Sequence, residues 1–406
     1  MGIVPDQTVI SQCLQLLDLP ETLCDILDYR AQKLTVRGAI FLFIEAQLAR
    51  REEPIAIEEH LRSNENLQAL VGTTSISASR FSRKLNELPT FLLQYAFQEI
   101  NRRIAQTLRE SSHVQVRDLK KLTIIDSTTI SLPNFHGQWA YCSKKQNSVK
   151  MHTYLCADFP DMAYPSKVIL STGAVADSEV TIELLTDKNT TYVMDRGYIN
   201  YAFFKKWAEA EIRFVARIQT NSKTKVIHER PILEEDYGLL RDADVEMVVP
   251  KEPDQKVTLR LVEFKDDKGR LYRVVTTRWE ISAREIANLY RDRWMIELFF
   301  KWMKQHLHLA KLYSYKPDAV WNQIYMTLLA YGLCILVKLQ TKTTKSTWEV
   351  LKLVRIYVME SWEKFLVALS RQPTRSSKGR QKKKKSGRPR IHPIKKKALK
   401  KILEQI

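Results

Sequence analysis

A change of sequence pattern near Asp118 constrains the fold more than any other feature. Before this point, segments such as VRGAIFLFIEAQLA and PTFLLQYAFQEINRRIAQTL place apolar residues at three- and four-residue steps, which predicts helices. After it come short runs rich in β-branched residues, including KLTIIDSTTISL, SVKMHTYLCAD, SKVILSTG and IRFVARIQ, with helical segments such as SEVTIELLTD between them. The sequence therefore predicts a helical domain followed by a mixed α/β sheet with flanking helices.

The alternation of strands and helices is interrupted between residues 220 and 278. Strand-like runs such as VTLRLVEFKDD and GRLYRVVTTRW, joined by turns such as DDKGR, predict an all-β insertion there. The predicted domains are a helical N-terminal DNA-binding domain (1–117), the first part of the core (118–219), the insertion (220–278), the second part of the core (279–340), a helical segment (341–371) and a basic tail (372–406).

The net charge indicates a polyanionic partner. Among 406 residues, 65 Lys and Arg outnumber 46 Asp and Glu, and the formal charge is +19. This favours a nucleic acid over a membrane surface, because the longest apolar run, Ile324 to Leu339, contains Gly332 and Lys338 and is too short to span a bilayer. We expect a buried helix there and no secretion signal in MGIVPDQTV. Five cysteines without paired spacing predict a reduced, cytosolic setting without disulfides or zinc.

Two segments outside the sheet have features of DNA-binding elements. The segment 57–88 is predicted to form a helix, a Gly/Thr/Ser break and a second helix that carries Arg80, Arg83 and Lys84, which fits a helix-turn-helix. An ordinary pair of antiparallel helices with a basic face is the alternative. The tail is predicted to be disordered, and its Gly-Arg-Pro-Arg sequence, with Arg388 and Arg390, resembles an AT-hook that enters the minor groove.

Two aspartates stand where strand propensity alone would not place them. Asp126 lies inside KLTIIDSTTISL, where a buried carboxylate is costly unless it is paired or binds a metal. Asp195 ends the run TTYVMD at the turn from a strand to a helix. Functional carboxylates favour this position, just beyond the carboxyl end of a strand. A helix cap or a turn would be enough to explain Asp195 alone.

The stretch 282–309, SAREIANLYRDRWMIELFFKWMKQHLHL, is predicted to form one long helix that begins with a capping box. At 100° per residue, Tyr290, Arg293, Glu297 and Lys304 fall on one narrow stripe. A carboxylate among groups suited to phosphate suggests metal-assisted chemistry on a polyanion. The alternative is a solvated face with an Arg293–Glu297 ion pair.

Together, Asp126, Asp195 and Glu297 predict a metal site. Carboxylates on a first strand, at a neighbouring strand end and on a covering helix can hold two divalent cations. Such a pair activates a water or a 3′-hydroxyl on one side of a phosphodiester and stabilises the leaving oxygen on the other. Ligands that are all oxygen favour Mg²⁺ or Mn²⁺ over zinc.

At these residues the chain resembles the bacterial IS-four group of DDE insertion-sequence transposases, whose catalytic core has a ribonuclease H-like fold. The stretch 282–309 carries that family's Y-x2-R-x3-E-x6-K spacing, and the two aspartates lie in IIDSTTISL and VMDRGY, as the family has them. The match covers roughly residues 120–310, and the β-rich insertion is also typical of the family. Lys150, His152 and Arg217 are lesser agreements. Ala176, which precedes Asp177, is a departure, because many relatives have a histidine there.

The resemblance implies roles for individual side chains. Asp126, Asp195 and Glu297 would hold the metal ions. Relatives cut the transposon end through a DNA hairpin, so Trp294 is a candidate to stack on an extruded base, with a structural tryptophan as the alternative. Tyr272 is a weaker stacking candidate. The implied phosphate contacts near the transposon end are Tyr290, Arg293 and Lys304.

The implied function is that of a cut-and-paste DNA transposase. It would bind terminal inverted repeats in double-stranded DNA, excise the element and join its 3′ ends to target DNA, as a homodimer in the synaptic complex and in the bacterial cytoplasm and nucleoid. Two alternatives remain: a structure-selective nuclease with a ribonuclease H-like fold, and a non-catalytic DNA-binding protein whose carboxylates are relics. All three carboxylates are present, which favours an enzyme.

Overall fold

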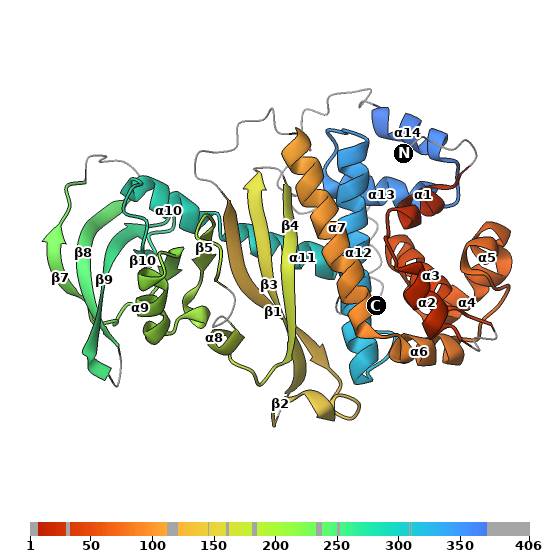
Figure 1. Ribbon diagram of the computed structural model, residues 1–406, viewed down its shortest axis with the longest axis horizontal. Helices are drawn as coiled ribbons and strands as arrows, with labels where there is room; N and C mark the ends of the chain where they lie inside the picture. Colours follow the sequence, from red (N-terminus) through yellow and green to blue (C-terminus); the bar gives the residue numbers. More distant parts are fainter. Residues whose placement is uncertain are drawn as a thin grey trace, which may run out of the picture. The chain divides into compact units, whose positions relative to one another are not determined.

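The computed structural model describes residues 7–371, apart from 30–32, 112–120, 145, 160–161, 181–184, 233–237, 250–251, 308 and 310. The chain divides into two compact units, residues 1–369 and 370–406. The elements below are those of the first unit (Figure 1). The basic tail predicted at 372–406, with Arg388 and Arg390, lies outside the described residues.

The N-terminal region is helical, as the apolar spacing predicts. Its central helix, α3 (Val36–Ala49), is buried along nearly its whole length, and most of its residues are apolar accordingly. The helices are α1 (Val9–Gln15), α2 (Glu21–Leu27), α3 (Val36–Ala49), α4 (Pro54–Ser63), α5 (Glu65–Val71), α6 (Ala78–Glu87) and α7 (Thr90–Ser111).

The predicted arrangement of two helices around one break in residues 57–88 is corrected by the structure. Three helices, α4, α5 and α6, run through this segment. The division between α4 and α5 occurs at Asn64, whose side-chain oxygen accepts a hydrogen bond from the Leu67 amide at 2.9 Å and so starts a new helix. The predicted break lies between α5 and α6, where Gly72 adopts a φ of +77° that favours glycine.

All ten strands of the described chain belong to one sheet. Its order is β2-β3-β1-β5-β6-β10-β9-β8-β7, and β4 pairs with β3. The strands are β1 (Leu122–Leu132), β2 (Tyr141–Ser143), β3 (Gln146–Phe159), β4 (Met162–Thr172), β5 (Thr191–Met194), β6 (Arg213–Arg217), β7 (Lys225–Glu229), β8 (Leu239–Val249), β9 (Glu252–Lys265) and β10 (Leu271–Thr276).

Five strands form the centre of the fold. β4, β3 and β1 are antiparallel neighbours, and β5 and β6 continue from β1 as parallel strands. The parallel step from β5 to β6 is made through α9 (Tyr201–Glu209), as a parallel connection requires a crossover. This order is that of a ribonuclease H-like fold, and the predicted mixed α/β class is confirmed.

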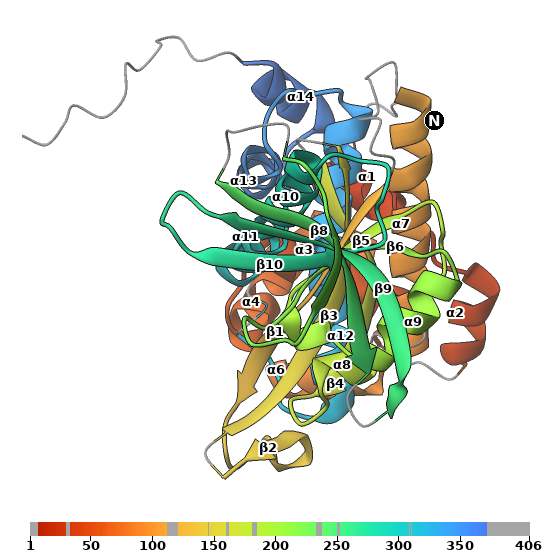
Figure 2. The ribbon, with the colours of Figure 1, turned by 90° about the vertical axis from the view of Figure 1, so that its left-hand side faces the viewer.

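The strands of residues 220–278 extend the same sheet. β10 pairs antiparallel with β6, with Val275 opposite Ala216, and β9, β8 and β7 follow outward. Figure 2 shows these outer strands facing the viewer. The predicted β-rich segment is therefore joined to the core by backbone hydrogen bonds as well as by the chain.

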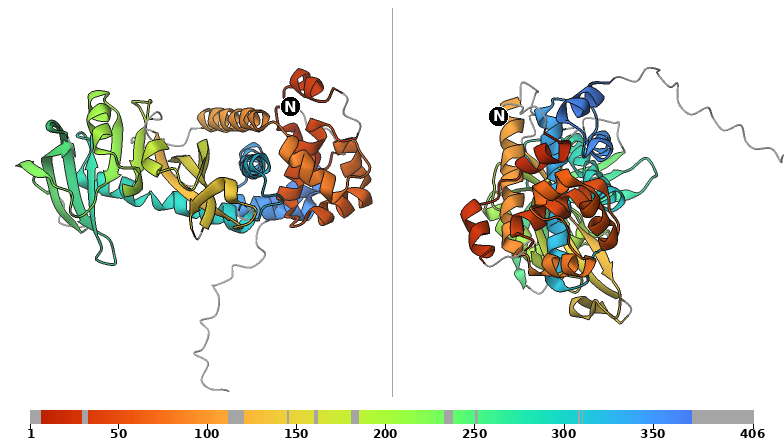
Figure 3. Two further views of the ribbon diagram at one scale, coloured as in Figure 1. Left: turned by 90° about the horizontal axis from the view of Figure 1, so that it is seen from below. Right: turned by 90° about the vertical axis from the view of Figure 1, so that its right-hand side faces the viewer.

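The prediction of one long helix over residues 282–309 is wrong. The structure has α10 (Ala283–Arg291) and α11 (Trp294–His306), separated by Asp292 and Arg293. The amides of Arg293, Met295 and Ile296 bond to the carbonyls three residues earlier, so the chain is wound more tightly at the junction than an α-helix. The capping box at Ser282 is present as predicted. In the view from below, α11 runs alongside the central strands (Figure 3).

Two further predictions about helices have different outcomes. The helix predicted over residues 178–187 is shorter, because α8 covers Asp177–Val180 and residues 185–187 are not helical. The buried helix predicted from Ile324 to Leu339 is present within α12 (Pro317–Gln340). α12 is long and apolar enough to cross a membrane by composition, but 94% of its most apolar window is buried in the protein.

The helix α12 packs along α7, and the two lie side by side in Figure 1. A Cβ atom at Gly332 would lie 2.5 Å from Ile100 Cγ2 of α7, so glycine permits this close approach. Two helices follow, α13 (Thr347–Tyr357) and α14 (Trp362–Ser370). All five cysteines fall within the described residues, and no disulfide joins any of them.

Candidate active site around Asp126, Asp195 and Glu297

The register of two parallel strands brings Asp126 and Asp195 together. Ile125 of β1 is aligned with Met194 of β5, so Asp126 and the residue after β5, Asp195, hold equivalent positions on adjacent strands. Aligned residues of parallel strands point to the same face of a sheet. Consistent with this proximity, the negative charge of Asp195 raises the pKa of Asp126, although burial raises it more.

The Arg293 guanidinium lies between Asp126 and Glu297. Its Nη1 atom is 3.3 Å from Asp126 Oδ2, and its Nη2 atom is 2.6 Å from Glu297 Oε1. Arg293 stands in the junction before α11 and Glu297 in the first turn of that helix, so helical spacing brings the second pair together. The ion pair of the solvated-face alternative therefore exists, but the same guanidinium also reaches a carboxylate of the sheet.

The environment of Asp126 disfavours the ionised form of its carboxyl group. Burial raises its pKa to about 6, and the carboxylates of Asp195 and Asp177 add to the increase. The Ser127 amide, which donates to Oδ1 at 2.8 Å, and the Arg293 guanidinium lower the pKa without cancelling the effect of burial. The positive charge of Arg293 alone does not compensate for the burial of this carboxylate. A divalent cation bound at Asp126 would stabilise its ionised form further.

Tyr290 and Arg217 hold Asp195. The Tyr290 hydroxyl donates to Asp195 Oδ1 at 3.0 Å, and Arg217 Nη1 is 3.7 Å from the same oxygen. Burial and the nearby Asp195 raise the pKa of Tyr290, so its phenol is protonated at neutral pH and remains a donor. Arg217 also stacks on the Tyr272 ring, 4.7 Å from its centroid. Side chains from β6 and α10 thus contact one carboxylate, and the β10 residue Tyr272 packs against one of them.

The other two residues predicted on α11 face different surroundings. Lys304 Nζ donates to the Thr129 carbonyl of β1 at 3.1 Å, which ties the second half of α11 to the sheet. Trp294 is 53% exposed. It lines a pocket of about 360 Å³ together with Tyr272, Tyr290 and Arg293. An exposed indole beside two tyrosines and a guanidinium is able to take a planar group.

A second group of charged residues, next to Asp126, contains interactions that sequence reasoning did not predict. Asp177 Oδ1 accepts a hydrogen bond from Ser127 Oγ at 3.1 Å, and it lies 3.3 Å from Lys150 Nζ and 3.5 Å from His152 Nδ1. Burial lowers the pKa of His152 to about 4, so the ring is neutral at pH 7. Lys150 and His152 were predicted only as family agreements, and their alternate spacing in β3 was the available signal.

The basic residues predicted on a DNA-reading helix have unequal exposure. Arg80 and Arg83 are exposed on α6, and Arg80 pairs with Glu87 at 3.0 Å. Lys84 is buried and is therefore not on the exposed face that a base-reading residue requires. Arg388 and Arg390 lie outside the described residues.

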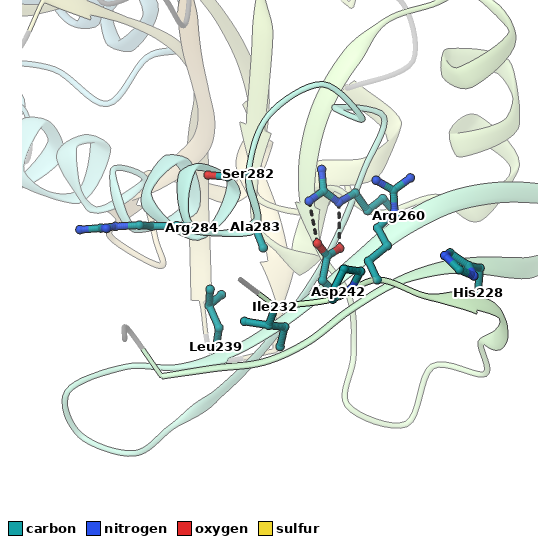
Figure 4. Close-up of a pocket in the computed structure, with 10 residues that line it drawn as sticks. His228, Ile232, Leu239, Asp242, Arg260, Ser282, Ala283 and Arg284 are labelled. Atoms are coloured by element: carbon teal, nitrogen blue, oxygen red, sulfur yellow. Dashed lines mark hydrogen bonds and ion pairs between the residues drawn. The ribbon is translucent and has the colours of Figure 1, made fainter. Parts of the chain in front are cut away.

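A separate pocket of about 460 Å³ lies where β7–β9 meet the start of α10 (Figure 4). At its wall, Arg260 of β9 forms a two-pronged ion pair with Asp242 of β8, with nitrogen–oxygen distances of 2.8 and 2.7 Å. Arg260 Nη1 also donates to the Ile281 carbonyl at 2.6 Å. The pair therefore fixes the segment that leads into α10 and positions the helix that carries Tyr290.

The chemistry of the donor set fits a hard divalent cation, although the side chains are not yet gathered around one. In the described part of the chain, no group of three or more His, Cys, Asp or Glu side chains is arranged to hold a metal ion. Asp126, Asp195 and Glu297 offer only oxygen, and the buried Asp126 retains a raised pKa in spite of Arg293. Oxygen ligands of this kind suit Mg²⁺ or Mn²⁺.

Comparison with known proteins places this geometry in a family. Residues 117–333 match the family model described as the transposase DDE domain. The chain is 27% identical over 327 residues to the "Probable transposase for insertion sequence element IS5377" of Geobacillus stearothermophilus, which covers 79% of this chain and 82% of that protein. A Sinorhizobium fredii protein that carries the transposase name y4zB is 28% identical over 255 residues, 62% of this chain and 70% of that protein. The transposase for insertion sequence element IS421 of Escherichia coli is 45% identical over 51 residues, 13% of this chain and 14% of that protein.

Proposed function

This chain belongs to the transposase DDE domain family, and from that premise we propose that it is a cut-and-paste DNA transposase of the IS-four group. It would bind terminal inverted repeats, cleave phosphodiester bonds at the ends of its element and join the 3′ ends to target DNA. The observation that carries the proposal is the convergence on Arg293 of Asp126 from β1 and Glu297 from α11, beside Asp195 at the end of β5.

The proposed metal ligands are Asp126, Asp195 and Glu297, and the proposed ions are two Mg²⁺ or Mn²⁺. When bound, the ions would supply Lewis acidity to a phosphate and lower the pKa of the attacking water or 3′-hydroxyl. Arg293 would move from the carboxylates to a phosphate, which its planar fork can hold at two oxygens. Tyr290 would keep Asp195 in place by donating its phenolic hydrogen.

Further residues would contact the DNA outside the metal site. Trp294 is proposed to stack on a base displaced by a hairpin, because it is exposed at the rim of a pocket that Tyr272 also lines. Lys304 would add a point charge near the backbone. Arg80 and Arg83, exposed on α6, are proposed to contact DNA from the N-terminal region.

The remaining features of the proposal concern organisation. The divisions at residues 117, 219, 278, 340 and 371 are retained as proposed functional segments, with 220–278 joined to the core by the β6–β10 ladder. A homodimer is proposed for the synaptic complex, and the bacterial cytoplasm and nucleoid for the location. Double-stranded DNA is the proposed partner, both as transposon end and as target.

A coupled cleavage and strand-transfer assay tests the function. We expect the purified protein, with Mg²⁺ or Mn²⁺, to cut a duplex that carries the element's end and to join the released 3′-hydroxyl end to a supercoiled plasmid. EDTA should abolish both steps. Cleavage without joining would indicate a nuclease, and binding without either step would indicate a non-catalytic DNA-binding protein.

The tail beyond Arg371 is predicted to add affinity that does not depend on DNA sequence. Residues 372–406 contain 14 lysines and arginines, among them the lysine run 382–385, Arg388 and Arg390, against one glutamate. Deleting residues 372–406 should weaken binding to every duplex and flatten the dependence of log K on log salt, because fewer counterions are released. Fluorescence anisotropy across a salt series measures both effects. An unchanged slope would mean that the tail does not contact DNA.

A further inference from the structure

A basic pocket lies in the helical N-terminal region, away from the carboxylates of the sheet. Its volume is about 640 Å³. Its lining comes from the end of α2, the segment before α3, the helix α4, the segment before α6 and α6 itself, in which Lys84 lies in the last turn. All of the charged residues in the lining are cations, Lys33, Arg62, Arg80 and Lys84, and two serine side chains, Ser75 and Ser77, lie among them. A cavity with cations and hydroxyl groups in its wall has the chemistry of an anion site.

Lys84 is the unusual member of this pocket. The residue is only 8% exposed, and it has no hydrogen-bond or ion-pair partner in the part of the chain that the structure describes. Burial lowers the pKa of its ammonium group, while the carboxylate of Asp28 raises it by a smaller amount. That carboxylate is engaged elsewhere, because Asp28 Oδ1 accepts a hydrogen bond from the Val36 amide at 2.7 Å. The side chain is thus largely enclosed while its ammonium group lines the pocket without a carboxylate partner among the described residues, so an anion in the pocket can complete its interactions.

Two of the other cations, Arg62 and Arg80, are held in position by carboxylates. Arg62 lies 2.7 Å from Glu58 and 3.3 Å from Glu59, and Arg80 lies 3.0 Å from Glu87. Glu58 also accepts a hydrogen bond from the Ala78 amide at 2.7 Å, which satisfies the first turn of α6. The N-terminal end of α6 thus already has a carboxylate partner in Glu58. The positive charge in the pocket that remains without a partner in the described part of the chain therefore belongs to side chains, above all to Lys84.

We propose that this pocket binds one phosphate group of the DNA backbone, with Lys84 as its central cation. The inference rests on the proposed function, since it takes the DNA of that function as the source of the phosphate. It changes the role predicted for α6. Lys84 would fix the position of this helix on the DNA backbone, and contacts with the base edges would be left to the exposed Arg83 and Arg80. Phosphate contacts of this kind set register and orientation and carry no sequence information themselves.

Substitution of Lys84 by methionine tests the proposal, because methionine keeps an unbranched buried stem and removes the charge. Inorganic phosphate should raise the melting temperature of the parent protein in a concentration-dependent way and should lose this effect in Lys84→Met. Affinity for a duplex should fall roughly five- to tenfold equally for all sequences, and the log–log salt slope should become shallower by about one unit. Lys84→Arg should restore much of both effects.

Lys352→Met is the matched charge control, because Lys352 is exposed on α13 and outside the pocket. It should respond to phosphate as the parent does. If Lys84→Met melts far below the parent without phosphate, Lys33→Gln at the rim of the pocket should still reduce the phosphate effect. A parent protein that binds and cuts DNA but is not stabilised by phosphate, with Lys84→Met binding normally, would overturn the pocket and leave the transposase function intact. Failure of the parent to bind any duplex would instead count against the function.

Discussion

Asp126→Asn is expected to abolish DNA cleavage while it leaves DNA binding nearly unchanged. The amide keeps the shape of the side chain but removes the negative charge that a divalent cation requires, and we expect cleavage to fall by roughly a thousandfold or more, equivalent to about 4 kcal/mol in the barrier. Affinity for the ends should change little, because it depends on phosphate neutralisation elsewhere. Asp195→Asn should behave in the same way. Full cleavage by either variant would remove that residue from the site.

The stability of Asp126→Asn separates loss of chemistry from loss of fold. The pKa of this carboxyl is about 6 in the folded protein and about 4 in an unfolded chain, so the folded state binds more protons between these values. Its contribution to stability therefore falls as the pH rises from about 4 to about 6 and stays unfavourable above that. At pH 7.5 the asparagine variant should melt at or above the parental temperature, and the gain should vanish near pH 4. A variant that melts far below the parent at pH 7.5 would contradict this account.

Arg293→Ala should change metal binding and DNA processing in opposite directions. In the free protein the guanidinium competes with any cation for Asp126 and Glu297, so its removal should raise the affinity for Mn²⁺ without DNA by about tenfold, as measured by calorimetric titration. With DNA present, the loss of a fork that grips phosphate should slow the steps after the first nick by roughly a hundredfold. A gel that resolves nicked, hairpin and fully cut ends distinguishes these steps.

Lys301→Ala is the control for Arg293→Ala. Lys301 is exposed on α11 and has no hydrogen-bond or ion-pair partner among the residues that the structure describes, so its loss changes the net charge alone. It should affect neither Mn²⁺ affinity nor cleavage. Unchanged Mn²⁺ affinity in Arg293→Ala would show that the guanidinium does not compete for the site. Normal progress through all three DNA species would reduce Arg293 to a surface ion pair, whose loss costs at most about 1 kcal/mol of stability.

The sheet and its two aspartates were accessible from the sequence because their signals are local. A run such as KLTIIDSTTISL carries its own strand propensity, and an aspartate within it conflicts with that propensity. The position of Asp195 at a strand end is also visible in five or six residues. Local signals of this kind predicted every strand from β1 to β6 except the short β2, and also the side chains that the register of β1 and β5 brings together.

The features that the sequence did not reveal depend on contacts between distant segments. Nothing in residues 282–309 marks a break at Asp292, since both residues of the junction are ordinary helix residues and the tighter turn is formed where Arg293 reaches Asp126, 167 positions away. The burial of Lys84 and the ring of contacts around Asp177 likewise require the packed structure. Helical stepping assumes an unbroken helix, so the geometry of the predicted stripe was wrong, although Tyr290, Arg293 and Lys304 each contact a residue at or beside the central strands.

The continuous ladder from β6 to β10 limits how this protein can be recombined with its relatives. A chimera that exchanged residues 220–278 as a block would replace one side of a hydrogen-bonded strand pair, and it would also separate Arg260 from the Ile281 carbonyl that leads into α10. Exchange points placed within the β8–β9 hairpin, outside Asp242 and Arg260, would leave both intact. Exchange of sequence in residues 220–278, in the laboratory or in evolution, is therefore easiest at the tip of the β8–β9 hairpin and hardest where β10 pairs with β6.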